Sequence, residues 1–497
     1  MAKERLLMRP NILLVTVDHW PGTLRDRAGV RTPTLDYLES IGTSYSRAYS
    51  ECPVCIPARR SLMTGTSPRL HGDRVFEPDG VMPPFPTLAS TLSDAGYQCF
   101  AVGKLHVYPQ RDRIGFHDVL LSEEGRPQLG AIDDYDLHLA DRGLPGMQFA
   151  HGMSPNDYHV RPWHLSEDLH PTNWTTTQMS RMIRRRDPSR PGFWYMSYQA
   201  PHPPLVPPAP YLDMYDLDEI EQPVSGEWST SDSLPYAVSA VRQQWPLDDP
   251  RQIAIARRAF YALCTHLDHQ LRVVIGTLRE EDILDDTLIV FTSDHGDMLG
   301  DHGLFAKRLF YEGATRVPMI VVPPRNSDRE SGNKDDRLVA LRDVMPTVLE
   351  FVGVDVPEDV DGLSMVGDEV RPHLYGEFGT NEHSTRMVTD SEFKLVYYPV
   401  GNVVQLFNLA LDPDELIDLA DDPGHSEHRS RLEALLMGEM YGSDLEWISD
   451  GTLVGVEPPD ELPPLDRGLH GVRGIHWPPP PLDTQPGRVV GAPEKHA

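Results

Sequence analysis

Two cysteines separated by two residues open the stretch of the chain whose residue types are richest in chemistry. It runs Cys52-Pro-Val-Cys55-Ile-Pro57-Ala-Arg59-Arg-Ser-Leu-Met-Thr64-Gly65. A Cys-x-x-Cys pair can be a redox couple or half of a zinc site. Structural zinc needs four thiolate or imidazole ligands, and the sequence holds no second pair of this kind. At this point a thioredoxin-like redox pair remains open.

Acids and imidazoles also follow two apolar runs of the chain. Asp18 comes directly after Asn11-Ile-Leu-Leu-Val-Thr-Val17, and Asp294 and His295 come shortly after Leu288-Ile-Val-Phe-Thr292. Both runs are rich in β-branched residues, which is the pattern of strands buried on both faces of a parallel sheet. Carboxylates and imidazole at the ends of such strands suit a divalent cation.

The elements that must position these residues alternate between strands and helices. We predict further strands at residues 99–102 and 192–198, and helices at 87–95 and 253–279. This alternation predicts a three-layer α/β/α sandwich. In open α/β sheets ligands bind outside the carboxyl ends of the strands, so acids that follow distant strands can meet at one site.

The chain divides into three predicted parts. Residues 1–363 form the α/β domain that carries the candidate site. Residues 364–455 form a smaller α+β subdomain, with antiparallel strands at 393–398 and 403–408 and a helix at 427–440. Residues 456–497 are too rich in proline for regular structure, and we expect them to form an extended tail.

Composition and charge exclude several classes of protein. The 497 residues include 45 Lys+Arg and 75 Asp+Glu, a net charge of −30, which repels phosphate backbones and anionic lipids. We therefore expect neither nucleic acid nor membrane as a partner. The N-terminal apolar run is too short for a signal peptide. Four cysteines are too few for a disulfide scaffold, so we expect a cytoplasmic protein.

Read from Cys55, the motif Cys-x-Pro-x-Arg-x-x-x-x-Thr-Gly resembles the signature of formylglycine-dependent (type I) sulfatases, a family of the alkaline-phosphatase superfamily. In that family the cysteine is oxidised after translation to an aldehyde, formylglycine. The block from Thr292 to Lys307, followed by Arg316-Val-Pro-Met319, is similar to the second metal motif of sulfatases and of phosphonate monoester hydrolases. The resemblance implies an alkaline-phosphatase-like fold and hydrolysis of a sulfate monoester.

The resemblance also implies roles for individual residues. The formylglycine hydrate offers one hydroxyl to attack sulfur and a second that later loses its proton and expels the ester. Arg59 and Lys104 would hold the hydrate and the sulfate, and His106 in Gly103-Lys-Leu-His106 would accept the hydrate proton. His202 would protonate or hydrogen-bond the leaving oxygen, and Lys307 would be a second cation on the sulfate. The implied metal ligands are Asp18, the modified Cys55, Asp294 and His295.

One position departs from the family pattern. Many sulfatases place a second Asp directly after the first, whereas His19 follows Asp18 here. Calcium favours many hard oxygen ligands, and the loss of a carboxylate in favour of imidazole tilts the site towards manganese or another transition ion. We expect Ca²⁺, with Mn²⁺ as the alternative, and leave His19 out of the ligand set.

A polar and aromatic segment between residues 156 and 174 has no clear periodicity. Arg161, Trp163 and Trp174 could face the substrate, because Trp stacks on sugars or aryl groups and Arg binds carboxylates. The segment could equally be an ordered surface loop packed by its own aromatic side chains. Both interpretations stay open.

The expected substrate is a small-molecule or carbohydrate sulfate ester, and maturation requires a formylglycine-generating enzyme. Oligomerisation is left open. A first alternative is a phosphonate monoester or phosphodiester hydrolase on the same scaffold, which the Lys104 and His106 pair disfavours because the phosphonate branch lacks it. A second is an inactive binding homologue, which would not require the full set of candidate catalytic residues.

Overall fold

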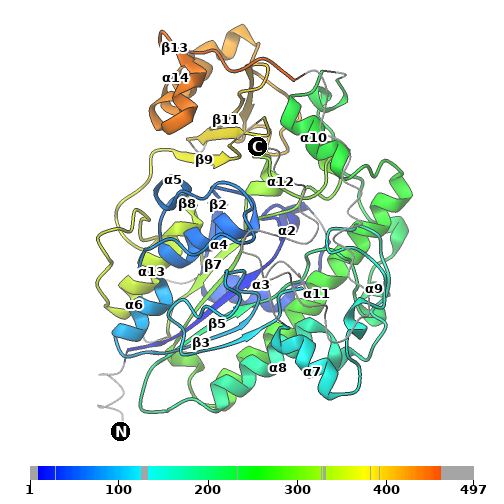
Figure 1. Cartoon of the computed structure of the whole chain (residues 1–497), viewed down its shortest axis with the longest axis vertical. Coiled ribbons are helices and arrows are strands. Elements are labelled where there is room, and N and C mark those ends of the chain that lie inside the picture. Colours follow the sequence, from blue (N-terminus) through cyan, green and yellow to red (C-terminus); the bar gives the residue numbers. More distant parts are fainter. Residues whose placement is uncertain are drawn as a thin grey trace.

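The computed structural model describes residues 9–27, 29–124, 132–231, 233–325, 327, 332–380, 382–390 and 392–459. An eight-stranded mixed sheet forms the centre of the larger part (Figure 1). Its strands lie in the order β4 (Asp118–Leu121), β3 (Gln98–Gly103), β5 (Gly192–Ser197), β1 (Asn11–Val17), β6 (Thr287–Ser293), β7 (Met319–Val322), β2 (Thr43–Tyr49) and β8 (Asn333–Ala340).

Strand β1 lies at the centre and is buried on both faces. It pairs in parallel with β5 on one side and with β6 on the other. Successive side chains of a strand point to opposite faces of the sheet. Accordingly, Leu13 and Val15 lie in one hydrophobic core, whereas Ile12 and Leu14 lie in a second. Two cores on one strand require a layer of helices on each face, which confirms the predicted sandwich.

Helices from distant parts of the chain form these two layers (Figure 1). The first core is closed by α3 (Pro33–Ile41), α7 (Asp134–Asp141), α8 (Pro171–Arg184) and α11 (Pro250–Glu280). The second is closed by α4 (Cys55–Thr64), α6 (Leu88–Asp94) and α13 (Val344–Val352). Shorter helices are α2 (Leu24–Arg27), α5 (Pro68–His71), α9 (Ala209–Leu212), α10 (Tyr236–Gln244) and α12 (Glu312–Thr315).

A second, antiparallel sheet lies at the top of Figure 1. It contains β12 (Val403–Asn408), β11 (Phe393–Tyr398), β10 (Thr385–Thr389) and β9 (Leu374–Phe378), in that order. Helix α14 (Ser426–Glu439) packs on one face through Leu432 and Leu436. The other face contributes Met387 and Val396 to a core shared with Phe310 of the larger part. A short hairpin follows, β13 (Ile448–Ser449) with β14 (Thr452–Leu453).

The predicted elements agree closely with those of the structure. Strands β1, β11 and β12 have the predicted bounds, and β3, β5, β6, α6, α11 and α14 differ from the prediction by a few residues at most. The domain boundary at residue 363 stays a prediction, although the second sheet begins after it. Most of the predicted tail, residues 460–497, lies outside the described residues. In the described part of the chain, no helix combines the length and the apolar character needed to span a bilayer.

Candidate active site

The candidate residues converge at one edge of the large sheet, where the parallel strands β1, β3, β5 and β6 end. Val17 and Ser293 are register partners, so Asp18 and Asp294 leave neighbouring strands side by side. The backbone N–H of Asp294 donates to the carbonyl of Val17 (3.2 Å). This is the meeting point that the two acid-terminated strands predict.

Gly103 positions the next candidate, Lys104, at the end of β3. Its φ is +107°, and a Cβ there would lie 1.8 Å from the carbonyl oxygen of Ser197 on β5. Only glycine fits this conformation and this close approach. The chain therefore turns into the site directly after β3, and the backbone N–H of Lys104 donates to the same Ser197 carbonyl (2.9 Å).

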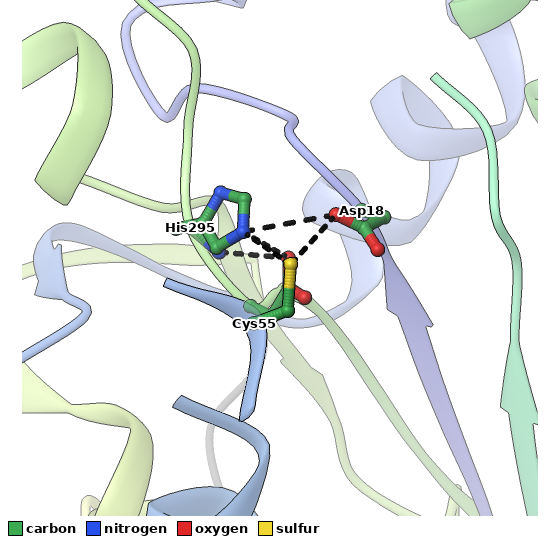
Figure 2. A group of neighbouring side chains, drawn as sticks. Asp18, Cys55 and His295 are labelled. Atoms are coloured by element: carbon green, nitrogen blue, oxygen red, sulfur yellow. Dashed lines mark hydrogen bonds and ion pairs between the residues drawn. The ribbon is translucent and has the colours of Figure 1, made fainter. Parts of the chain in front are cut away.

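Cys55 is the first residue of α4, a helix in which every residue is buried and which ends at Gly65 in the left-handed conformation. Its thiol points towards the strand ends (Figure 2). The Sγ lies 3.2 Å from Nε2 of His295 and 3.9 Å from Oδ1 of Asp18. Cys52 is a free, buried thiol that packs in a hydrophobic core with Phe310 and Met387. Cys55 instead contacts acids, an imidazole and a lysine, which favours a role beside a cation over a redox pair with Cys52.

The predicted ligand set has the geometry of a cation site. Asp18, Cys55, Asp294 and His295 each place one ligand atom within 4.8 Å of the other three. His295 Nδ1 lies 2.9 Å from the carbonyl oxygen of Gly296, and donation to that carbonyl leaves Nε2 as the lone-pair atom. That atom is 3.7 Å from Asp18 Oδ1 and 3.6 Å from Asp294 Oδ1. Two carboxylates and an imidazole so arranged suit a divalent ion.

Arg59 lies one turn along α4 and binds the carboxylates of this set. Its Nε donates to Asp294 (2.9 Å) and its Nη2 donates to Asp18 (3.3 Å). Nη1 donates to the hydroxyl of Ser197 (2.8 Å) and to the carbonyl of Lys104 (3.0 Å). The guanidinium therefore fixes the two carboxylates. The predicted contact of Arg59 with the hydrate and the sulfate stays a prediction.

Two lysines complete the charge balance around the thiol. Lys104 Nζ donates to Asp18 and, at 2.9 Å, to Glu124. Lys307 Nζ donates to Cys55 Sγ (3.2 Å). Burial and Asp18 raise the pKa of Cys55, but Lys307, Lys104 and His295 lower it by more, to a net value of about 7. Cations around the thiol therefore favour negative charge at this position.

His19 and His202 stand beside the ligand set without lying in it. Their rings meet edge to face with centroids 4.2 Å apart. His202 Nδ1 lies 3.6 Å from Glu124. Burial lowers the pKa of both histidines well below the usual value, and Lys307 lowers that of His19 further. Both rings are therefore neutral near pH 7, and each can donate one hydrogen bond and accept another.

His106 is buried on the loop after β3, in the left-handed conformation (φ +59°). Its backbone N–H donates to Glu123 (2.9 Å), and its ring meets that of Phe76 at a centroid distance of 5.6 Å. These contacts fix the loop two residues beyond Lys104. The proposed proton-accepting role of His106 stays a prediction.

The three predicted substrate contacts occupy different environments. Trp163 lines a pocket that adjoins His202, together with Glu124, Tyr135, Phe149, His151 and His170. Arg161 is exposed. Trp174 lies within α8, is 3% exposed and packs edge to face on Tyr135. It belongs to the hydrophobic core and cannot reach a substrate, which corrects the prediction for this residue.

Other residues at the site were not selected from the sequence. Asp297 accepts hydrogen bonds from His19 (2.7 Å) and from the hydroxyl of Tyr158. Glu124 follows β4, just as Asp18 and Asp294 follow β1 and β6. Its position after a strand could therefore have indicated it from the sequence. Asp297 lies inside the Thr292–Lys307 block. Tyr158 lies in the 156–174 segment, for which a substrate-facing role stayed open, but its spacing does not single it out.

Comparison with known proteins indicates the same family as the motifs do. The family model described as Sulfatase matches residues 10–354, and one described as N-sulphoglucosamine sulphohydrolase, C-terminal, matches residues 300–440. An arylsulfatase of Clostridium perfringens (strain 13 / Type A) is 34% identical over 467 residues, covering 89% of this chain and 97% of that protein. A choline-sulfatase of Rhizobium meliloti (strain 1021) is 29% identical over 445 residues, covering 86% and 85%.

Solved structures share the fold. A phosphonate monoester hydrolase from Silicibacter pomeroyi superposes with a TM-score of 0.74 at 24% identity, covering 89% of this chain and 97% of that one. A protein in complex with its substrate D-glucosamine-2-N,6-O-disulfate gives a TM-score of 0.68 at 19% identity, covering 86% and 97%. At these identities the likeness shows the architecture alone.

Proposed function

The chain belongs to the sulfatase family and hydrolyses sulfate monoesters, and from this premise we propose that it does so with formylglycine at position 55 and one divalent metal ion. The observation that carries the proposal is the position of the Cys55 side chain. It starts a buried helix, faces the ends of β1 and β6, and lies 3.2 Å from both His295 Nε2 and Lys307 Nζ.

Formylglycine would supply a hydrated aldehyde: one hydroxyl would attack sulfur and displace the alcohol, and loss of the proton from the other would release sulfate and restore the aldehyde. The residues around position 55 support such a nucleophile. Lys307 and Lys104 place positive charge beside it, which favours an ionised oxygen as it favours the thiolate. Both ammonium groups also suit the sulfate oxygens, on which negative charge is concentrated as the ester bond breaks.

Asp18, Asp294 and His295 would hold the metal ion, with the residue at position 55 as a further ligand. The ion supplies Lewis-acid stabilisation to the nucleophile and the sulfate oxygens. Arg59 fixes the two carboxylates from the side through its bonds to both. We expect calcium, and the imidazole in the donor set makes manganese the alternative for metal analysis to test.

His202 is placed to act on the alcohol side of the ester. It lies within reach of Asp18 and His19, and it also lines the pocket that contains Trp163. Its Nδ1 donates to the carbonyl of Pro203, so Nε2 is the ring atom that faces this chemistry, and it would donate to the leaving oxygen once the ring carries a second proton. We assign His106 as the group that accepts the hydrate proton, since it follows Lys104 on the same loop.

The alcohol part of the substrate would bind in the pocket beside His202. Its walls combine aromatic, proline and aliphatic side chains with Glu124, and no Lys or Arg is among the residues that line it in the described structure. Burial lowers the pKa of His151 to about 4 and that of His170 to about 3, so both are neutral near pH 7. The pocket therefore favours an uncharged small molecule or sugar ring over one that carries a carboxylate.

The mass of the peptide that contains Cys55 tests the nucleophile. Conversion of the thiol to formylglycine lowers this mass by about 18 Da, and Cys55→Ser and Cys55→Ala remove turnover of an aryl sulfate because neither supplies a geminal diol. Cys52→Ala is the matched control and retains turnover. An unmodified thiol in an active enzyme, or full activity of Cys55→Ala, overturns the proposal.

Maturation then requires a formylglycine-generating enzyme in the host. Co-expression with such an enzyme should raise both the modified fraction of the Cys55 peptide and the specific activity in proportion. A specific activity that does not follow the modified fraction contradicts this requirement.

A further inference from the structure

His19 is the residue at which the chain departs from the family pattern, and it lies in a chain of buried hydrogen bonds. Its Nδ1 is 2.7 Å from Oδ2 of Asp297. Its Nε2 meets the ammonium group of Lys307. Tyr158 contacts Asp297 from the loop whose role the sequence leaves open. All four side chains are buried.

The contacts of Asp297 fix the proton of His19. Oδ1 of Asp297 accepts from the backbone N–H groups of Leu299 (2.9 Å) and Ala306 (3.0 Å). Oδ2 faces His19 and the hydroxyl of Tyr158, and a carboxylate only accepts hydrogen bonds. Nδ1 of His19 therefore donates to Asp297, and Nε2, which faces the ammonium group of Lys307, accepts.

Lys307 is held by this acceptor. An ammonium group has three donors and no acceptor, so Lys307 donates one N–H to His19 Nε2 and a second to Cys55 Sγ (3.2 Å). A lysine side chain otherwise has four flexible bonds, and a fixed acceptor removes this freedom. The third N–H remains for a sulfate oxygen.

We propose that Tyr158, Asp297 and His19 are positioning residues that aim the Lys307 ammonium group at the reacting sulfate. Asp297 orients the imidazole, and the hydroxyl of Tyr158 holds Asp297. The inference rests on the proposed function in one respect, since it takes Lys307 as a sulfate contact. It assigns His19 to the hydrogen-bond network rather than to the metal, because its Nε2 faces a cation.

The first test separates hydrogen bonding at position 19 from bulk. His19→Gln keeps one donor and one acceptor on the same terminal group, whereas His19→Leu keeps only the volume. His19→Leu should lower kcat/KM for an aryl sulfate by about 10- to 100-fold, as loss of a supporting hydrogen-bond partner does. It should weaken competitive inhibition by inorganic sulfate in parallel. His19→Gln should recover most of both values, and both variants should keep the metal content of the parent.

The second test measures coupling. Tyr158→Phe should lower kcat/KM by about 10-fold in the parent but have little effect in His19→Leu, because both residues act through the same ammonium group. Tyr45→Phe is the matched control: it removes a buried hydroxyl that bonds the carbonyl of Met365 (3.1 Å) and should leave kcat/KM unchanged. If His19→Leu does not fold, the test is the comparison of kcat/KM between Tyr158→Phe and Tyr45→Phe. Equal kcat/KM values for these two variants overturn the proposal.

Two results overturn the inference while leaving the nucleophile intact. Loss of metal in His19→Leu makes His19 a ligand. Independent, multiplicative effects of Tyr158→Phe and His19→Leu mean that no shared network exists. A Lys307→Ala variant with full activity is different, because it removes Lys307 from the proposed function itself.

Discussion

The buried acids at the ends of β1 and β6 pair with buried basic residues on α4 and after β3. Asp18 contacts Arg59 and Lys104, and Asp294 contacts Arg59. Breaking one member of such a network leaves an uncompensated charge away from water, which is strongly unfavourable. Each catalytic substitution therefore needs a check of folding beside its check of activity.

The metal ligands give the first prediction at this scale. Asp294→Asn and Asp18→Asn each remove a carboxylate charge and should lower the bound metal, with turnover reduced far more than the folded fraction. Metal analysis, an aryl sulfate assay and circular dichroism measure the three quantities. Asp26→Asn is the matched control, since Asp26 pairs with Arg316 at the surface. Chelation should reduce turnover reversibly, and full-rate turnover by metal-free protein would contradict the ligand assignment.

Lys104 gives the second residue-scale prediction, which separates sulfate from phosphonate esters. A phosphonate places a carbon substituent where a sulfate oxygen would lie, and the buried ammonium group of Lys104 suits the oxygen. The parent should prefer an aryl sulfate to the matched aryl phenylphosphonate. Lys104→Ala should lower sulfate turnover by on the order of 10²-fold and phosphonate turnover by less. Lys334→Ala, on the exposed part of β8, is the control, and an equal loss on both substrates would favour the phosphonate alternative.

Most of the candidate site could be predicted from motifs, and the exceptions have physical causes. Motif spacing predicts which residues gather, but not which acceptor an arginine finds. Arg59 turns to Asp18 and Asp294 because both lie within reach of one guanidinium. Trp174 falls in a loop-like sequence, yet His170 caps a helix that starts directly after it, and the helix buries this ring.

At the scale of elements, α6 shows how local sequence sets a helix boundary. Thr87 accepts from the backbone N–H of Ser90 (3.0 Å), and Ser90 accepts from that of Thr87 (2.9 Å). Thr87→Ala should lower the stability of the protein by about 1 kcal/mol, seen as a lower unfolding midpoint with unchanged activity. Thr91→Ala within the same helix is the control and should be neutral or slightly stabilising. Equal midpoints for both variants would exclude a capping contribution.

Strands buried on both faces could be predicted from their apolar runs, whereas β2 and β8 could not. Their sequences, Thr-Ser-Tyr-Ser-Arg-Ala-Tyr and Asn-Lys-Asp-Asp-Arg-Leu-Val-Ala, contain polar residues throughout most of their length. β8 is the edge strand of the sheet and β2 lies next to it, and exposure of side chains near an edge relaxes the apolar requirement. Their pairing with each other, rather than their composition, makes them strands.

At the scale of the whole molecule, polar groups join the two sheets. Lys394 on β11 is buried and pairs with Glu312 of α12 (2.8 Å) and with Glu415 (2.6 Å). The carbonyl of Glu51, just after β2, accepts from the backbone N–H of Glu377 on β9 (2.8 Å). The smaller sheet is therefore attached to the chain segment that leads into α4.

Glu51 makes this junction sensitive to pH. Burial raises its pKa from 4.5 to about 7, although Arg342 and Arg371 oppose the rise. The folded state thus binds the proton more tightly than the unfolded state, so this contribution is present below pH 4.5 and is lost as the pH rises to about 7. The unfolding midpoint of Glu51→Gln, relative to that of the parent, should rise as the pH is raised from 5 to 8. A difference independent of pH would contradict the assignment.

The order of the strands along the chain also determines when the site can form during synthesis. Cys55 is 2% exposed, and its Sγ contacts His295, which follows β6 and lies more than two hundred residues further along the chain. At about 5–20 residues per second, synthesis of the intervening stretch takes roughly tens of seconds. During that interval the nascent segment around Cys55 has no β6 to pack against. If Cys55 is converted to formylglycine as proposed, the modifying enzyme would bind this segment before β1 and β6 pair, and we expect the modified fraction to be set during synthesis.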